Sequence, residues 1–249
     1  MEQFYTNTTS DIVVCPSGLS GRIRKMKAGE ARNVWKRGKS VNVDPFGDLI
    51  KACWVETHEF GPYTPTADNK LDWSKVMLGE RLTVLNAIRM YTLGTSYQFE
   101  VNCERCGELV DWTVELNELS DVKMSEDDLA TFAIDNRFES TLPGTGVKVW
   151  FKTLLGEDEA RLAQIRKRQK TLDILDLVRY QVIEIENVDR PKIAKYIEDM
   201  DWDDVVHLWN TIQATACGLD TRFDIQCSAC NAVQRVDLPF VQTYFIPQI

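Results

Sequence analysis

The chain has 249 residues, of which 44% are hydrophobic and 27% are charged, and its formal net charge is −9. This composition is typical of a folded globular protein with one large domain, or with one domain and a subdomain. The negative charge argues against a general affinity for phosphate backbones, because that affinity needs Lys and Arg to displace counterions. No run of about 18 apolar residues occurs, and Met1–Tyr5 does not resemble a secretory signal, so we expect neither a membrane span nor secretion.

Residues 1–94 are predicted to form an N-terminal mixed α/β segment. Hydrophobic spacing and turn residues predict two strands followed by three helices, at residues 11–14, 20–25, 28–37, 44–54 and 78–93. The second helix has a typical start, because Asp44 can cap it and Pro45 suits its first turn. Gly94 is expected to end the third helix. Residues 59–72 are rich in Gly, Pro, Thr and Asn and are expected to form a loop.

Two segments far apart in the chain share one layout: a strand, a Cys-x-x-Cys knuckle, a turn residue and a second strand. The knuckles are Cys103-Glu104-Arg105-Cys106 and Cys227-Ser228-Ala229-Cys230. Apolar and polar residues alternate on both sides of the first knuckle, which predicts a β-hairpin folded over each cysteine pair. Residues 95–116 and 219–249 are therefore predicted to form a split, zinc-ribbon-like β subdomain.

The chain between the knuckles, residues 117–218, is predicted to be a mainly helical insertion. A strand is expected at residues 147–151 after the turn Pro143-Gly144-Thr145-Gly146. Four helices are expected to follow, from Gly156, over 172–185, from Pro191 to about Met200, and from Asp201 to Ala216. In the last helix we expect Asp201 to act as the cap with Asp204 three residues on, and Trp202, Val205 and Trp209 to face inward. The predicted fold class is thus α+β, with zinc-ribbon-like hairpins that clamp a mostly helical insertion.

The two knuckles together predict a structural zinc site with Cys103, Cys106, Cys227 and Cys230 as ligands. Structural zinc prefers four tetrahedral thiolates, and a two-residue spacer lets both sulfurs of a knuckle reach one ion. The residue after each second cysteine is Gly107 or Asn231. Both residue types tolerate left-handed backbone, which lets backbone amides turn toward the sulfurs.

Other interpretations of the cysteines stay open at this stage. Cys106 and Cys227 are separated by 120 residues, far more than the 15 to 20 of a compact ribbon, so the zinc site requires the insertion to return to its starting point. A redox dithiol, two reduced unpaired knuckles and another metal are the alternatives. Redox knuckles usually open a helix, which these hairpins lack. Of the other three cysteines, Cys53 and Cys217 are expected in the core, and Cys15 has no predicted role.

No catalytic residue and no small-molecule substrate are predicted. Four cysteine ligands close the coordination sphere and leave no position for an activated water. The sequence contains no Gly-rich phosphate loop, nucleophile elbow or zincin motif. A zinc-ribbon nucleic-acid-binding regulator is the alternative function, although Arg105 is the only basic residue near the knuckles.

Four motifs in order resemble the baseplate hub and baseplate assembly proteins of contractile-tailed bacteriophages (myoviruses). The motifs begin at Pro16-Ser17-Gly18, at Leu78-Gly79-Glu80-Arg81, at Leu155-Gly156-Glu157-Asp158-Glu159, and at Leu219-Asp220 before the second knuckle. The resemblance implies a non-enzymatic structural or assembly protein of the tail baseplate hub. It further implies other hub, spike or tape-measure proteins as partners, and a location in the virion tail and, during assembly, the host cytoplasm. Nucleic acid and membranes are not expected as partners.

Overall fold

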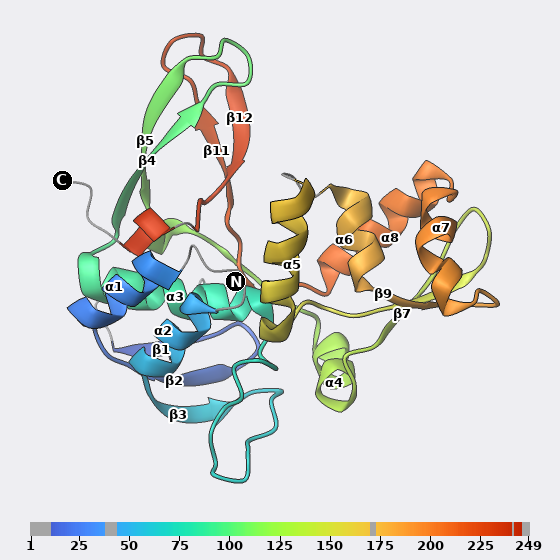
Figure 1. Cartoon of the computed structure of the whole chain (residues 1–249), viewed down its shortest axis with the longest axis horizontal. Coiled ribbons are helices and arrows are strands. Elements are labelled where there is room, and N and C mark those ends of the chain that lie inside the picture. Colours follow the sequence, from blue (N-terminus) through green and yellow to red (C-terminus); the bar gives the residue numbers. More distant parts are fainter. Residues whose placement is uncertain (1–10, 38–43, 170–172, 241, 246–249) are drawn as a thin grey trace.

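The computed structural model describes residues 11–37, 44–169, 173–240 and 242–245, and within these ranges the protein is a mixed α/β fold with several small sheets (Figure 1). Residues 1–10, on which the absence of a secretory signal was judged, lie outside this part of the chain. No helix of the described part is long and apolar enough to cross a bilayer.

The strands are β1 (Ile12–Val14), β2 (Leu19–Ile23), β3 (Trp54–Phe60), β4 (Ser96–Asn102), β5 (Leu109–Glu115), β6 (Asp121–Val122), β7 (Phe138–Thr141), β8 (Lys148–Phe151), β9 (Val182–Ile185), β10 (Gly218–Leu219), β11 (Arg222–Gln226) and β12 (Val233–Asp237). The helices are α1 (Ala28–Arg37), α2 (Pro45–Cys53), α3 (Leu78–Leu93), α4 (Glu126–Ile134), α5 (Gly156–Gln169), α6 (Ile174–Gln181), α7 (Ile193–Glu198) and α8 (Trp202–Ala214). Short 3-10 turns are η1 (Leu116–Glu118), η2 (Arg190–Lys192) and η3 (Gln242–Phe245).

The elements gather in three regions (Figure 1). The antiparallel sheet β1-β2-β3 lies with α1, α2 and α3 at one end of the molecule. The antiparallel sheet β7-β8-β9 lies with α6, α7 and α8 at the other end. The hairpins β4–β5 and β11–β12 project together away from α3. We call this pair of hairpins the projecting module.

Local sequence patterns predicted several elements correctly. Helix α3 has the predicted bounds, and Gly94 follows it with a positive φ of 89°. The Asp44 side chain accepts a hydrogen bond from the Gly47 amide at 2.6 Å and so caps α2 as expected. Cys53 and Cys217 are buried in the core, and so is Cys15.

The predicted helix over 172–185 is wrong at its C-terminal end. Helix α6 ends at Gln181, and the next four residues form β9, which pairs with β8. The apolar residues Val182, Ile183 and Ile185 fit a helical stripe, but they are β-branched and favour a strand where a sheet edge is available. Strand β3 was likewise missed: Trp54 was assigned to the second helix and residues 59–60 to the following loop, because apolar and polar residues do not alternate regularly between Trp54 and Phe60.

The inner face predicted for the last helix also needs correction. Only Trp202 departs from it, because as the first residue of α8 it is 60% exposed, whereas Val205 is buried as predicted and Trp209 packs, partly buried, against the core. Asp201 precedes the helix without a side-chain capping bond. Asp204 is fully buried and accepts a hydrogen bond from the Gly144 amide at 2.7 Å, so it holds the turn between β7 and β8.

The first turn of α3 buries a carboxyl group that receives hydrogen bonds from three distant segments. Glu80 has no exposed surface. The backbone amide of Ser17 donates to it at 2.8 Å, the hydroxyl of Tyr63 also donates, and the thiol of Cys217 lies 3.7 Å away. The carboxyl therefore ties the loop between β1 and β2, the loop before α3 and the chain before β10 to one helix end.

The next residue, Arg81, ties two further helices to the same place. Its guanidinium is 1% exposed and lies 2.6 Å from Asp44 at the start of α2 and 2.9 Å from Glu159 in α5. A Cβ atom at Gly156 would come within 2.0 Å of this guanidinium, so only glycine fits at the start of α5. We call the groups around Glu80 and Arg81 the α3 node.

A close backbone contact completes the α3 node. Gly79 lies against Gly218 of β10, and a Cβ atom at Gly218 would come within 2.0 Å of the Gly79 carbonyl carbon. The φ of Gly218 is 128°, a conformation that L side chains rarely adopt. Glycine is therefore required at residue 218 for both space and backbone conformation.

We expect Gly218→Ala to lower the free energy of unfolding by about 3 kcal/mol or more, because the new methyl group must displace backbone atoms of α3. Gly29→Ala is the matched control, since a Cβ at Gly29 in α1 meets nothing within 4 Å. That change should leave stability unchanged or raise it by less than about 1 kcal/mol. Urea unfolding followed by circular dichroism measures both, and equal effects would contradict the close contact.

Glu80 should also make stability depend on pH. Burial raises the pKa of Glu80, and the hydrogen bonds from Tyr63 and Ser17 offset only part of that rise. The folded protein thus keeps a proton that the unfolded chain releases near its ordinary pKa of about 4.3, so stability falls as the pH rises from there through the folded pKa. Glu80→Gln cannot titrate, and we expect it to lose less stability than the wild type as the pH rises above the ordinary glutamate pKa of about 4.3. Parallel declines in urea unfolding experiments would show that Glu80 does not titrate in this range.

Candidate metal centre

The projecting module places the two knuckles at the tips of matching hairpins. Strands β4 and β5 pair in register from Ser96 and Glu115 to Asn102 and Leu109, and the first knuckle closes this hairpin. Strands β11 and β12 end with Gln226 paired to Val233 on either side of the second knuckle. Apolar side chains from both hairpins meet between them, including Phe99 and Phe223, whose ring centroids lie 5.9 Å apart. This packing brings the two tips together.

Both knuckles adopt the same turn. The amide of Cys103 donates to the Glu108 carbonyl at 2.8 Å, and the amide of Gly107 donates back to Cys103 at 2.8 Å. The corresponding bonds in the second knuckle, from Cys227 and Asn231, are each 2.9 Å long. Gly107 and Asn231 have positive φ angles of 74° and 56°, as their residue types predict.

The four sulfur atoms of the knuckles form one cluster. All lie within 4.8 Å of one another, and the pairs between hairpins, Cys103 to Cys230 and Cys106 to Cys227, are 3.6 and 3.7 Å apart. Tetrahedral zinc with Zn–S bonds of about 2.3 Å requires sulfurs about 3.8 Å apart. The separation of 120 residues is thus closed by the fold, and the spacing of the donors fits a single zinc ion.

The charges of the thiols also favour a cation. A hydrogen bond from the backbone of Cys106 lowers the pKa of the Cys103 thiol to about 7. At Cys106 a hydrogen bond from the backbone of Glu108 also lowers the pKa of the thiol. The neighbouring sulfurs, with Cys230 foremost, outweigh this effect and raise the pKa of Cys106 to about 12. One thiolate therefore forms readily, whereas further negative charges disfavour one another. A divalent cation held by all four sulfurs would remove this repulsion.

Burial of the four cysteines is uneven. Cys103 and Cys227 are buried and pack with Val110, whereas Cys106 is exposed and Cys230 is partly exposed. Four thiolates would complete the coordination of a zinc ion without a position for water, so the arrangement suits a structural ion rather than a catalytic one. The remaining cysteines, Cys15, Cys53 and Cys217, take no part in this cluster.

A second link between the hairpins lies beside the sulfurs, and the sequence did not reveal it. The side-chain oxygen of Gln234 in β12 accepts from the Glu104 amide at 2.8 Å, and its nitrogen donates to the Asn102 carbonyl at 3.1 Å. One amide side chain thus satisfies two backbone groups of the other hairpin. A glutamine in an alternating strand reads as a surface residue, so only the three-dimensional pairing identifies it.

The base of the projecting module is fixed to α3 by a buried arginine. Arg89 donates from Nη2 to the Ser96 carbonyl at 2.9 Å and from Nε to the Tyr244 carbonyl at 3.3 Å. Its guanidinium also lies 5.5 Å from the centre of the Tyr97 ring. The hydroxyl of Tyr244 donates to Asn86, one turn before Arg89. The module is therefore held at its base by α3, and near its tip the Gln234 side chain links the two hairpins beside the sulfur cluster.

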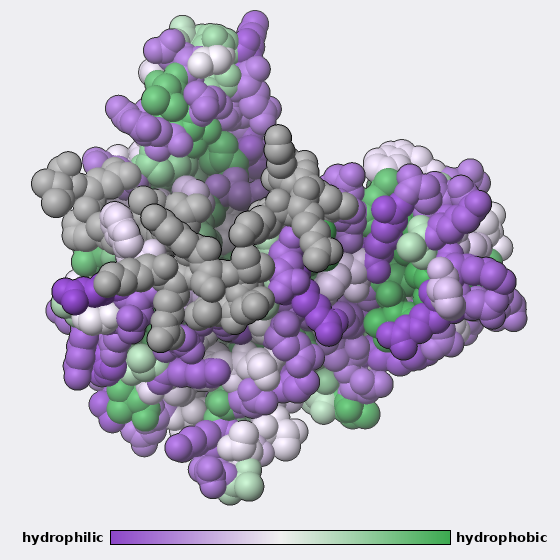
Figure 2. All heavy atoms as spheres, in the orientation of Figure 1, coloured by the Kyte–Doolittle hydropathy of each residue, from purple (hydrophilic) through white to green (hydrophobic). Residues whose placement is uncertain are grey.

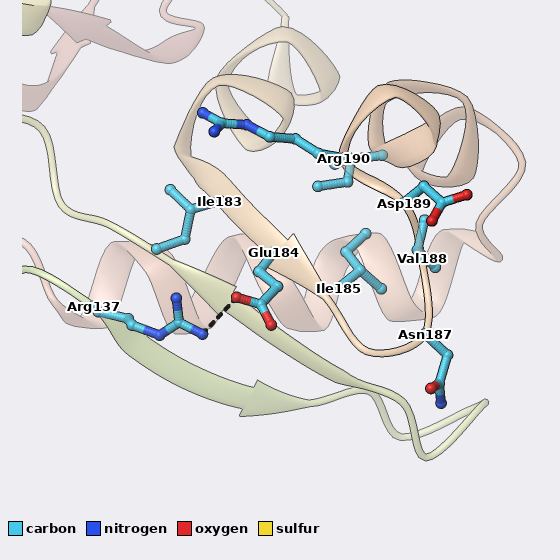
Figure 3. Close-up of a pocket in the computed structure, with 9 residues that line it drawn as sticks. Arg137, Ile183, Glu184, Ile185, Asn187, Val188, Asp189 and Arg190 are labelled. Atoms are coloured by element: carbon cyan, nitrogen blue, oxygen red, sulfur yellow. Dashed lines mark hydrogen bonds and ion pairs between the residues drawn. The ribbon is translucent and has the colours of Figure 1, made fainter.

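A separate surface hollow of about 690 Å³ lies along β9 (Figure 3). Figure 3 shows Arg137 reaching toward Glu184, and the ion pair between them is 2.7 Å long. Asp189 at the rim pairs with Lys192 at 2.6 Å. Arg190 also lines the hollow, and the lining residues bring together no nucleophile with a base. On the surface of the projecting module, hydrophobic side chains lie among hydrophilic ones (Figure 2).

The comparison with protein families identifies the chain. A family model described as T4 bacteriophage base plate protein matches residues 63–246, about three quarters of the sequence. The chain belongs to this family of phage baseplate proteins, as the resemblance of its motifs indicated. Comparisons with curated proteins and with solved structures produced no match.

Proposed function

We propose that this protein is a non-enzymatic structural or assembly protein of the baseplate hub, with one structural zinc ion held by Cys103, Cys106, Cys227 and Cys230. Membership of the baseplate family supports the structural role. The observation that carries the metal part is the cluster of four sulfurs from two distant hairpins, all within 4.8 Å of one another. Other hub, spike or tape-measure proteins would be its partners in the virion tail and, during assembly, in the host cytoplasm.

In this proposal the zinc ion acts as a clasp. The two hairpins flank residues 117–218, which contain α4 to α8 and the sheet β7-β8-β9. Bringing the ends of so long a segment together costs chain entropy, and metal binding at the tip would offset part of that cost. We therefore divide the chain into residues 1–94, the split β subdomain of 95–116 and 219–249, and the insertion between them.

Loss of one ligand should release the metal and loosen the projecting module without unfolding the body. We expect purified wild-type protein to contain about one zinc per chain and Cys227→Ser to contain far less. Amide exchange in β11 and β12 should speed up by at least about tenfold in the variant, while exchange in α3 changes little. Elemental analysis and hydrogen exchange measure these effects.

Cys53→Ala serves as the control for that experiment, because it removes a buried thiol outside the sulfur cluster. It should keep the zinc and the slow exchange of β11 and β12. Wild-type protein that contains no zinc, with all seven thiols free to titrate, would refute the metal part of the proposal.

The hub assignment is tested by cross-linking in infected cells followed by mass spectrometry. We expect the protein in hub assembly intermediates or finished tails, with cross-links to hub, spike or tape-measure proteins. Cross-links confined to proteins of the baseplate periphery would make the hub assignment wrong while leaving the family intact. Absence from both intermediates and tails would refute the assembly role itself.

A further inference from the structure

The two hairpins of the projecting module provide an internal comparison of surface charge. Because both pair in the same register away from their knuckles, each position in one hairpin has an equivalent in the other. The pair Glu100 and Asp111 in β4–β5 corresponds to the pair Asp224 and Arg235 in β11–β12. All four side chains are exposed.

The two equivalent pairs differ in charge: one pair has opposite charges, and the other has two negative charges. In β11–β12, Arg235 lies 3.5 Å from Asp224, so opposite charges face one another. In β4–β5, two carboxylates face one another, and neither makes a hydrogen bond or ion pair with any side chain of the described ranges. Like charges directly opposite in an antiparallel pair destabilise the sheet. The like-charge pair in β4–β5 is therefore unfavourable in the isolated protein. The opposite charges at the equivalent position of β11–β12 show that the hairpin fold does not require it.

The same face of β4–β5 exposes an aliphatic side chain. Leu109 is 52% exposed and lies on the outward face with Asp111 and Thr113, whereas Val110 points inward to the sulfur cluster. The equivalent residue of β11–β12, Val233, is 65% exposed, so an exposed aliphatic side chain is common to both hairpins and the like-charge pair is what distinguishes this face. The module projects from the body, so this face can be reached by a large partner (Figure 1).

We propose that the outward face of β4–β5 is a docking surface for a basic patch of another tail protein. Lys or Arg of the partner would pair with Glu100 and Asp111, and an apolar side chain beside them would pack on Leu109. Charge complementarity selects a basic partner, because the unpaired carboxylates repel one another until cations neutralise them. The proposal rests on the baseplate role and adds the chemistry of the partner.

Asp111→Arg tests the surface, because it gives β4–β5 the charge pattern of β11–β12. The variant should gain stability, with a melting temperature about 1–3 °C above the wild type. It should at the same time bind baseplate intermediates about tenfold more weakly. The probe is the set of intermediates isolated from cells infected with a phage that lacks this gene, and binding is measured at low and high salt. Wild-type binding should fall as salt rises.

Arg235→Asp is the matched control, since it creates the like-charge pair in the other hairpin. It should lower the melting temperature by a similar amount and leave binding unchanged. Leu109→Ser and Val233→Ser form a second pair, because Val233 is the equivalent residue and is 65% exposed. Only Leu109→Ser should weaken binding.

Several results would overturn the proposal. Unchanged binding by Asp111→Arg, beside normal wild-type binding, would refute the docking surface and leave the baseplate role standing. Equal losses in Asp111→Arg and Arg235→Asp would show that the face is not specific. Wild-type self-association abolished by Asp111→Arg, measured by ultracentrifugation, would make the occupant a second copy of this chain. A wild-type protein that binds no intermediate and restores no tails would refute the surface and the baseplate role together.

Discussion

The buried polar side chains at the start of α3 are the constraint on which the fold depends. Glu80 and Arg81 are adjacent in sequence, fully or almost fully buried, and joined to partners between residues 17 and 217. A buried ion pair adds little net stability, but removing one partner leaves an uncompensated charge and costs about 3–5 kcal/mol. The node therefore acts mainly through specificity, because an arrangement that separates any of these segments from α3 leaves the Glu80 carboxyl or the Arg81 guanidinium buried without a partner.

The node also explains how the distant knuckles meet. Gly218 packs on Gly79 immediately before β11, and Arg89, further along α3, holds the start of β4. One helix thus fixes the base of both hairpins, and their apolar faces carry the alignment outward to the sulfurs. Metal binding at the tip would act on hairpins already placed side by side, which lowers the entropy that the ion must offset. Contacts at the α3 node and metal binding at the sulfur cluster would thus both bring together the two ends of residues 117–218.

Sequence patterns predicted the parts of the structure that local rules decide. The bounds of α3, the two hairpins, and the left-handed turns at Gly107 and Asn231 follow from periodicity and backbone preference. The four proposed ligands follow from the matching layout of strand, Cys-x-x-Cys knuckle, turn residue and strand, and the fold brings their sulfurs together. Strand β9 was assigned to a helix because its apolar spacing fits both structures, and pairing with β8 decides the outcome. The sequence shows no sign that Glu80 is buried, and it places Asp204 in a helix cap, since the partners of both residues lie far away in sequence.

The motifs that resemble baseplate proteins acquire a physical meaning in the α3 node. Ser17, Gly79 to Arg81, and Gly156 to Glu159 come from three of those motifs, and they meet at one point. The family match begins at Tyr63, whose hydroxyl donates to Glu80, so the N-terminal sheet joins the matched region through the same carboxyl group. In this chain, three of the four motifs therefore have a role in core packing. In our proposal partner choice depends instead on the outward face of β4–β5, where the exposed side chains of Glu100 and Asp111 take no part in that packing.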